Sequence, residues 1–208
     1  MADRTIKVLT PATSVSFLTL AEAKLLLGSS SAVTDPQLQM MIDVHSATVM
    51  RLCNRIFARE EVQDTWRDIG GRRVFTSHWP VAAADVESVY SGGSPLASGD
   101  YELEEGSGKI SVFNGSWAEP VVVTYWGGYV LPDEAPLPLK QATSLLVRET
   151  KIQASIESTA GIRSLSFRDR RVMFFDPSKI LSSAGPGGKS MAAQAAANLL
   201  VHYTRWEV

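Results

Sequence analysis

The sequence predicts an α+β fold with an antiparallel helical core, an inserted small antiparallel β-sheet region and an extended C-terminal helical arm. Three observations support this prediction. Apolar residues recur at helical spacing in residues 35–56 and 137–154. Residues 60–127 instead alternate polar and apolar residues between glycine and proline turns, which is typical of short strands. A last helical stretch, Met191 to about Tyr203, follows the glycine-rich residues 182–190.

The composition is that of an ordinary globular chain. Of its 208 residues, 45% are hydrophobic, and the net charge of −2 gives no global reason to expect nucleic-acid or membrane binding. The single cysteine, Cys53, excludes an intramolecular disulfide and favours a reducing cytosolic setting. No apolar run approaches the ~18 residues of a membrane span, and the N-terminus lacks the apolar run of a signal peptide. We therefore expect no membrane partner.

The predicted helical core begins after a polar arm formed by residues 1–16. Thr19 and Glu22 have the spacing of a capping box, which predicts a helix over residues 19–27. The helix over residues 35–56 is the element on which we expect the core to be built, because one of its faces is apolar throughout. Its apolar face comprises Leu38, Met41, Ile42, His45, Val49, Leu52, Cys53 and Ile56, with Ser46 among the polar residues opposite. The helix over residues 137–154 is its expected packing partner.

The sheet region is predicted from alternation and turns. Val62, Asp64, Trp66 and Asp68 fall on one face of a strand, and a turn at Gly70-Gly71 would return residues 72–77 as its hairpin partner. Residues 121–126, VVVTYW, form the clearest strand. Residues 82–119 contain seven acidic residues and one base, Lys109, so one surface of the sheet should be acidic. Together these elements predict a core in residues 1–155, followed by a C-terminal extension and arm in residues 156–208.

The motifs that could carry chemistry favour no enzyme, cofactor or metal. GPGGKS at residues 185–190 resembles a phosphate-binding loop, but Ser183 stands where the motif requires its first glycine. His45, His78 and His202 have no second ligand at metal-binding spacing. His45 lies on the apolar helix face, which favours a satisfied core or interface histidine. We therefore predict that the chain is not an enzyme and needs no cofactor.

Two segments of the C-terminal region could contact a partner. Arg168, Arg170 and Arg171 lie beside Phe174 and Phe175, an arrangement that suits either stacked bases or a protein groove. Because the whole chain is not basic, protein contact is the favoured reading, and a nucleic-acid-binding or processing protein using Arg168–Phe175 is the alternative. The last helix offers apolar anchors at Leu199, Leu200, Tyr203 and Trp206. It could fold back on its own core or dock into another subunit, and the sequence leaves both open.

Six segments carry a resemblance to a known family: FLTLAEAKLLLG, TDPQLQMMIDVHSATVMRLCNR, SHWPVAAADVESVY, SGDYELEEGSGKISV, PVVVTYWGGYVLPDEAPLPLKQATSLLVRE and AANLLVHYTRWEV. Their order and spacing, over about Leu18–Arg148 and again at the C-terminus, resemble the head–tail adaptor (connector) proteins of long-tailed bacteriophages and phage-like gene transfer agents. Residues 156–190 match the family poorly. The resemblance implies a virion structural protein at the head–tail junction, assembled in the bacterial host cytoplasm.

The resemblance also implies partners. Family members form a homo-oligomeric ring, usually of twelve copies, below the portal protein. They extend the DNA channel and bind a downstream stopper or tail-completion protein, while their C-terminal segments bind the portal. DNA would pass through without sequence-specific binding. For this chain, the portal-docking candidates are Leu199, Leu200, Tyr203, Trp206, Phe174 and Phe175. The channel-lining candidates are Glu102, Glu104 and Glu105, because carboxylates repel phosphates and let DNA slide. The sequence leaves open the alternative that these residues form an acidic outer surface that aids solubility.

Overall fold

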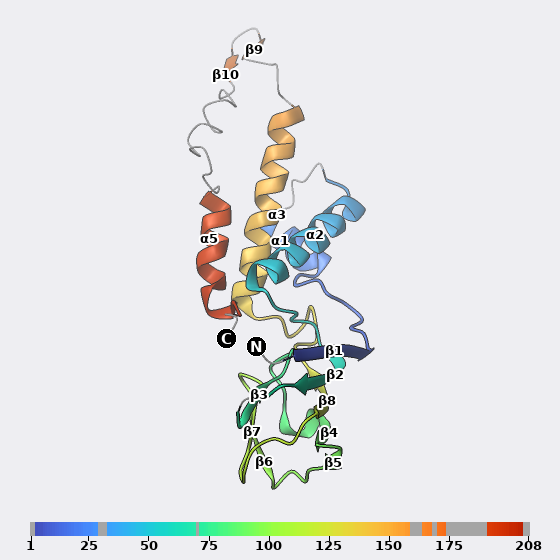
Figure 1. Cartoon of the computed structure of the whole chain (residues 1–208). Coiled ribbons are helices and arrows are strands. Elements are labelled where there is room, and N and C mark those ends of the chain that lie inside the picture. Colours follow the sequence, from blue (N-terminus) through green and yellow to red (C-terminus); the bar gives the residue numbers. More distant parts are fainter. Residues whose placement is uncertain are drawn as a thin grey trace. The chain divides into compact units, whose positions relative to one another are not determined.

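The computed structural model describes residues 3–28, 33–69, 71–158, 164–167, 170–173 and 191–205. The chain forms two compact units, each built from segments far apart in the sequence (Figure 1). The β unit contains residues 1–17, 53–135 and 205–208. The helical unit contains residues 18–52 and 136–204.

Two antiparallel sheets build the β unit. The five-stranded sheet has the order β1-β2-β8-β4-β5, with β1 at one edge (Figure 1). Its strands are β1 (Asp3–Thr10), β2 (Glu60–Arg67), β8 (Val121–Gly127), β4 (Val86–Ser91) and β5 (Ser94–Pro95). The three-stranded sheet has the order β3-β7-β6, formed by β3 (Arg73–Phe75), β7 (Lys109–Val112) and β6 (Tyr101–Glu104). A single 3-10 turn, η1 (Ala83–Asp85), precedes β4.

The interior of the β unit follows the alternation of β2 and β8. Val62 and Trp66 of β2 are buried in one cluster with Val121, Val123 and Tyr125 of β8. Ladder pairs join the two strands, with Val62 opposite Tyr125 and Trp66 opposite Val121. The predicted alternation is confirmed for Val62, Asp64 and Trp66, and it places the carboxylate of Asp64 among these apolar side chains. It is wrong for Asp68, which lies beyond the end of β2 with a φ of 60° and is exposed.

Two predictions for the sheet region are wrong. Residues 1–16 are not merely a polar arm, because they contain the eight-residue strand β1, which pairs with β2 from Asp3 opposite Arg67. Residues 72–77 do not form a hairpin with β2: β3 pairs with β7, and the two sides of β2 are occupied by β1 and β8. The local turn signal was outweighed because β1 and β8 offer β2 much longer ladders than the three residues of β3 can offer.

The helical unit contains α1 (Leu20–Leu27), α2 (Asp35–Cys53), α3 (Leu137–Ser158) and α5 (Met191–Leu200). The single turn η2 (Val201–Tyr203) follows α5, and a short antiparallel pair, β9 (Ser164–Phe167) and β10 (Arg170–Met173), lies between α3 and α5 in the sequence. The predicted capping box is confirmed: the Glu22 N–H donates to Thr19 Oγ1, and the Thr19 N–H donates to the Glu22 carboxylate. The Lys140 ammonium lies 2.6 Å from the Glu22 carboxylate, so α1 is also held to α3.

The predicted pairing of the two long helices is also confirmed. Ile42 of α2 and Val147 of α3 lie in one buried cluster, and the His45 Nε2 atom is 2.8 Å from the Thr150 hydroxyl. Burial lowers the pKa of His45, which is half-buried. The prediction of a satisfied histidine holds only for Nε2, because the buried Nδ1 atom has no hydrogen-bond partner among the described residues. The helix ends at Cys53 rather than residue 56, because Asn54 adopts a left-handed φ of 49°.

The burial of α2 corrects the predicted apolar face at three positions. Leu52 and Ile56 are exposed, whereas Ser46, predicted on the polar side, is fully buried. Ile56 lies beyond the end of the helix, so its side chain no longer follows the helical stripe. For the last helix, the structure shows the first of the two alternatives, since α5 packs against α3 and buries Ala196 and Leu200 (Figure 1).

Candidate functional site

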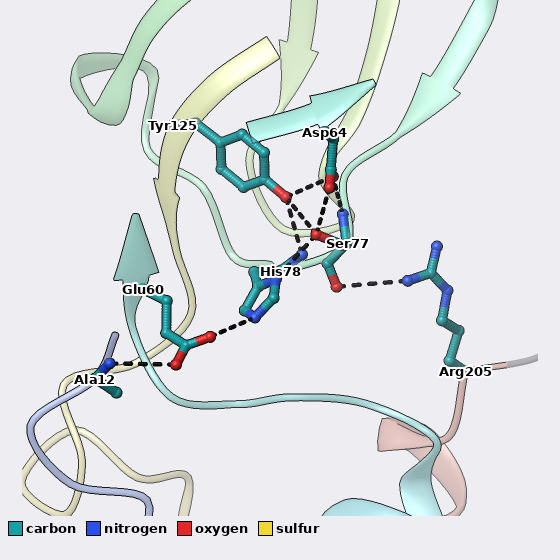
Figure 2. Close-up of polar contacts among 7 residues, drawn as sticks. All are labelled: Ala12, Glu60, Asp64, Ser77, His78, Tyr125 and Arg205. Carbon is teal, nitrogen blue, oxygen red and sulfur yellow. Dashed lines mark hydrogen bonds and ion pairs between the residues drawn. The ribbon is translucent and has the colours of Figure 1, made fainter. Parts of the chain in front are cut away.

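A buried polar network lies at the centre of the β unit (Figure 2). We call it the Asp64 network, and its members are Glu60, Asp64, Ser77, His78 and Tyr125. The Asp64 carboxylate accepts hydrogen bonds from the Ser77 N–H at 2.6 Å, the Ser77 hydroxyl at 2.8 Å and the Tyr125 hydroxyl at 2.8 Å. Because Asp64 has no exposed surface, these donors replace the water that would otherwise solvate its charge.

His78 extends the network towards Glu60. Its Nδ1 atom is 2.9 Å from the Ser77 hydroxyl and its Nε2 atom is 3.1 Å from the Glu60 carboxylate. Burial lowers the pKa of His78, against the opposing influence of Glu60 and Asp64. A neutral His78 therefore donates its Nε2 proton to Glu60, and its Nδ1 atom then competes with the Asp64 carboxylate for the single proton of the Ser77 hydroxyl. Burial and the neighbouring Asp64 carboxylate together raise the pKa of Tyr125, so its hydroxyl keeps its proton as a donor.

The order Ser77, His78, Glu60 is that of a hydrolase triad, but the geometry does not suit catalysis. The Ser77 hydroxyl also contacts Asp64 and Tyr125, and the residue is only 6% exposed. A nucleophile must reach a substrate carbonyl, and this oxygen is enclosed by its own partners. What the network does is fasten segments together: Glu60 also accepts a hydrogen bond from the Ala12 N–H at 3.2 Å, so it joins the segment after β1 to the rest (Figure 2).

A second arrangement holds the chain at its C-terminal end. We call it the Trp79 clamp, formed by Arg55, Trp79 and Arg205. The guanidinium of Arg55 lies 3.8 Å from the Trp79 ring centre and donates to the Trp79 carbonyl, while that of Arg205 lies 5.0 Å from the same ring. Arg205 also donates its N–H to the Cys53 carbonyl at 2.8 Å and a guanidinium N–H to the Ser77 carbonyl at 3.4 Å (Figure 2).

The Trp79 clamp depends on the positive charges of Arg55 and Arg205 at the Trp79 ring. Burial lowers the pKa of Arg55 to about 10, which still leaves it positive at neutral pH. Two guanidinium groups near one indole ring are each attracted to its π face, at about 0.5–2 kcal/mol per contact. The Ser77 carbonyl connects the clamp to the Asp64 network, so Arg205 is bound to the part of the β unit that the network makes rigid.

The structure places the predicted docking residues differently from one another. Leu199 and Tyr203 are half-buried, whereas Leu200 is 2% exposed and is covered by its own chain. Trp206, Phe174 and Phe175 lie outside the described residues, as do Arg168 and Asp169. Arg170 and Arg171 belong to β10. Of the candidates on the described part of α5 and η2, Leu199 and Tyr203 therefore keep surface that a partner could reach.

The predicted channel-lining residues lie on or beside β6. Glu102 and Glu104 share its exposed face, as the alternation predicts. The Lys109 ammonium lies 2.5 Å from the Glu104 carboxylate and lowers the pKa of that carboxyl. Glu105 follows the strand, and its carboxylate accepts a hydrogen bond from the Ala83 N–H at 2.8 Å. Glu102 thus presents its charge to solvent, while Glu104 and Glu105 also hold neighbouring segments in place.

Sequence reasoning missed both the Asp64 network and the Trp79 clamp. One signal could have indicated the first: an aspartate on the apolar face of an alternating strand requires buried donors. The clamp joins residues that are distant in the sequence, and nothing local predicts it. Among the described residues, no three His, Cys, Asp or Glu side chains gather closely enough to hold a metal ion. No helix in the described part of the chain is long and apolar enough to span a membrane.

Comparison of the sequence with protein-family models identifies the family of the chain. The family model described as "head completion protein" matches residues 16–168. The chain belongs to the head completion protein family. No curated protein matches this head completion protein in sequence.

Solved structures show the same fold at low sequence identity. A chain from the "neck of native GTA particle computed with C12 symmetry" is 13% identical with a TM-score of 0.56, and one from the "virion of native gene transfer agent (GTA) particle" is 14% identical with a TM-score of 0.55. A chain from the "neck of empty GTA particle computed with C6 symmetry" is 15% identical with a TM-score of 0.54. Each match covers 98% of this head completion protein and 97% of the other chain. The structural match covers nearly the whole chain, whereas the family match covers residues 16–168.

Proposed function

We propose that this head completion protein is a structural adaptor of the head–tail junction. It would form a ring beneath the portal, extend the DNA channel, and join the capsid to the tail or to the next connector protein. The observation that carries the proposal is the fold shared along nearly the whole chain with proteins of gene transfer agent necks, one of them computed with C12 symmetry. We propose twelve copies in the ring, a number supported by the C12 symmetry of one matched neck, although another was computed with C6 symmetry.

The geometry of the β unit favours a mechanical role over an enzymatic one. The titratable groups that could do chemistry, His78 and Ser77, are buried and bonded to one another. Their bonds join β2, β8 and the segment after β1, so the β unit is stiffened where a ring subunit must transmit load. We therefore assign no catalytic activity to the chain.

The C-terminal end is the proposed portal-docking element. Arg205, the residue before the proposed anchor Trp206, is held by the Trp79 clamp. Leu199 and Tyr203 would add contacts from α5 and η2, with Phe174 and Phe175 as a second anchor. Leu200 could join them only if α5 left the surface that now covers it. Repeated around a ring, contacts of modest affinity would give a durable joint.

The acidic face of β6 is the proposed channel surface. Glu102, with Glu104 and Glu105 beside it, would repel DNA phosphates so that DNA slides rather than binds. DNA would pass without sequence-specific contacts. The downstream stopper or tail-completion protein would bind the opposite end of the ring from the portal.

The test is attachment to portal rings by the purified full chain and by two variants. Trp206→Ala should weaken attachment at least tenfold, because aromatic anchors dominate interface energies. Val201→Ala, at an exposed position on η2, is the matched control and should bind as the wild type does. Equal binding by Trp206→Ala and wild type would show that the C-terminal segment of the chain is not the portal-docking element. Tight and steeply salt-dependent DNA binding by the isolated chain would favour the nucleic-acid alternative instead.

A further inference from the structure

The β unit has a sheet edge, strand β1, that no other strand of the described residues covers. Strand β1 is eight residues long, contains no proline and has exposed or half-exposed side chains throughout. Ile6 is 44% exposed and Val8 is 43% exposed. A long edge strand with uncovered apolar side chains such as these is a template for association, even with Asp3, Arg4 and Lys7 on the same strand, and proteins that need to stay monomeric often shorten such edges. The opposite edge is shortened in this way, because β5 has two residues, one of them Pro95.

The register shows that β1 continues the interior face of the sheet past its core. Val8 lies opposite Val62, and Ile6 lies opposite Asp64. Residues that face each other across an antiparallel ladder point to the same side of the sheet. On β2 that side is fully buried at Val62 and Asp64, whereas on β1 the same side is open. Ile6 and Val8 are therefore core-type positions that lack a cover in the described chain.

Charge differs between the two ends of both sheets. At the β1 end, Arg4 and Lys7 lie on β1 together with one acid, Asp3, and Arg73 lies on β3, the edge strand of the second sheet, so bases outnumber acids there. The Arg4 guanidinium reaches the Phe75 carbonyl at 3.4 Å, so β1 and β3 lie at the same end. At the other end, Glu87 lies on β4 and Glu102 lies on β6. The Glu105 carboxylate holds the Ala83 N–H, which places the turn after β6 next to the approach to β4.

Each end also carries exposed aromatic surface. Phe75 of β3 is exposed at the basic end, and Tyr90 of β4 is exposed at the acidic end. One end is thus basic with uncovered apolar side chains, and the other is acidic with an aromatic side chain available. We name them the β1 end and the β4 end.

We propose that the β1 end of one copy of this chain docks onto the β4 end of the next copy, with Ile6 and Val8 covered by the neighbour. Charge complementarity selects this occupant. A contact between two β1 ends would bring Arg4 and Lys7 of one copy near the same basic residues of the other, which repel them. A head-to-tail contact instead brings these bases near Glu87, which attracts them. A contact between different surfaces also repeats from copy to copy and closes into a ring, whereas a contact of one surface with itself stops at a dimer.

The inference rests on the proposed ring and adds the surfaces through which the ring closes. It is tested with the photoreactive residue p-benzoylphenylalanine in place of Lys7, in an equal mixture of ¹⁴N- and ¹⁵N-labelled full chains. Irradiation of the concentrated protein, and of particle necks that contain it, should yield mixed-isotope peptides that join residue 7 to residues 86–95 of another copy. The same residue in place of Met40, an exposed position in the helical unit, is the control and should not give that product.

Complementation gives a second readout. Ile6→Lys should disable the β1 end and Tyr90→Lys the β4 end, each weakening self-association at least tenfold by placing a charge in an apolar contact. A mixture of the two variants should recover heterodimers, because each variant keeps the surface that the other lacks. Both positions are exposed, so the stability of the monomer should hold.

Three results would overturn the inference: cross-links only within one copy, cross-links between two β1 strands, or no heterodimer in the mixture. A chain that enters necks normally without the residue 7 product refutes this contact and leaves the adaptor role standing. A chain that never enters necks counts against the adaptor role itself.

Discussion

Removing the carboxylate of Asp64 is the most direct way to test whether the buried network stabilises the β unit. In Asp64→Ala, the Ser77 hydroxyl can turn to His78 Nδ1 at 2.9 Å, and the Tyr125 hydroxyl can turn to Ser77 Oγ at 3.0 Å. The Ser77 N–H, now 2.6 Å from the carboxylate, cannot turn and loses its acceptor. A buried donor left unpaired costs about 1–3 kcal/mol, and each weakened hydroxyl bond adds about 0.5 kcal/mol. The expected loss is therefore about 3 kcal/mol of unfolding free energy.

Two further variants make the reasoning specific. In Asp64→Asn, the amide oxygen can still accept from the Ser77 N–H and the Tyr125 hydroxyl, while its NH₂ donates to Ser77 Oγ. That variant should lose only about 1 kcal/mol, because every buried group keeps a partner. Glu102→Ala, on the exposed face of β6, should change stability by less than about 0.5 kcal/mol.

The assay is urea unfolding near neutral pH, followed by tryptophan fluorescence, which reports on the β unit because all five tryptophans fall in its segments. A loss below about 1 kcal/mol in Asp64→Ala would refute the reasoning, because the orphaned Ser77 N–H alone should cost that much. Equal losses in the Ala and Asn variants would show that charge, rather than hydrogen bonding, decides the stability of the site.

Three other outcomes are expected. Burial lowers the pKa of His78 below 6.5, so the unfolded chain binds more protons at this residue than the folded chain does. The free energy of unfolding should therefore fall as the pH drops below about 6.5. In a profile of unfolding free energy against pH, His78→Gln should flatten this fall. Leu200→Ala should lower the unfolding free energy by about 2–4 kcal/mol in thermal or urea unfolding, with Val201→Ala within about 0.5 kcal/mol, and equal effects would show that α5 does not belong to the packed helical unit. Burial raises the pKa of the Cys53 thiol to about 11, so a thiol reagent should label it far more slowly in the native protein than in urea; comparable rates would contradict its burial.

Much of the fold followed from local pattern. The capping box of α1 and the alternation along β2 depend on residues a few positions apart, and the structure confirms them. The pairing of α2 with α3, also confirmed, was predicted from the apolar stripe that each helix shows locally. Strand β1 could not be found in this way, because both of its faces are largely exposed and the alternation of Ile6 and Val8 does not mark a buried side within the chain. The hairpin prediction failed for the complementary reason: a glycine turn is a local signal, whereas the partner of β2 is decided by the length of competing ladders.

The candidate site was less accessible to sequence reasoning than the fold. The face shared by Glu102 and Glu104 could be read from period-two alternation. The Asp64 network draws Glu60, Ser77 and Tyr125 from separate segments, so its members become neighbours only after the sheet has formed. The Trp79 clamp spans a still greater separation, because Arg205 meets Trp79 and the Ser77 carbonyl from the far end of the chain.

Arg205 is the last described residue of the chain and is held by contacts within the β unit. A C-terminal segment that holds a partner transmits force to the residue at which it joins the folded unit. Here that residue is bound at its N–H by the Cys53 carbonyl and at its side chain by the Ser77 carbonyl and the Trp79 ring. Ser77 in turn is held by Asp64 through both its N–H and its hydroxyl. The Asp64 carboxylate therefore holds Arg205 indirectly, through Ser77. Under the proposed docking role, a variant that loosens the Asp64 network should weaken portal attachment, although Asp64 is not one of the proposed docking residues.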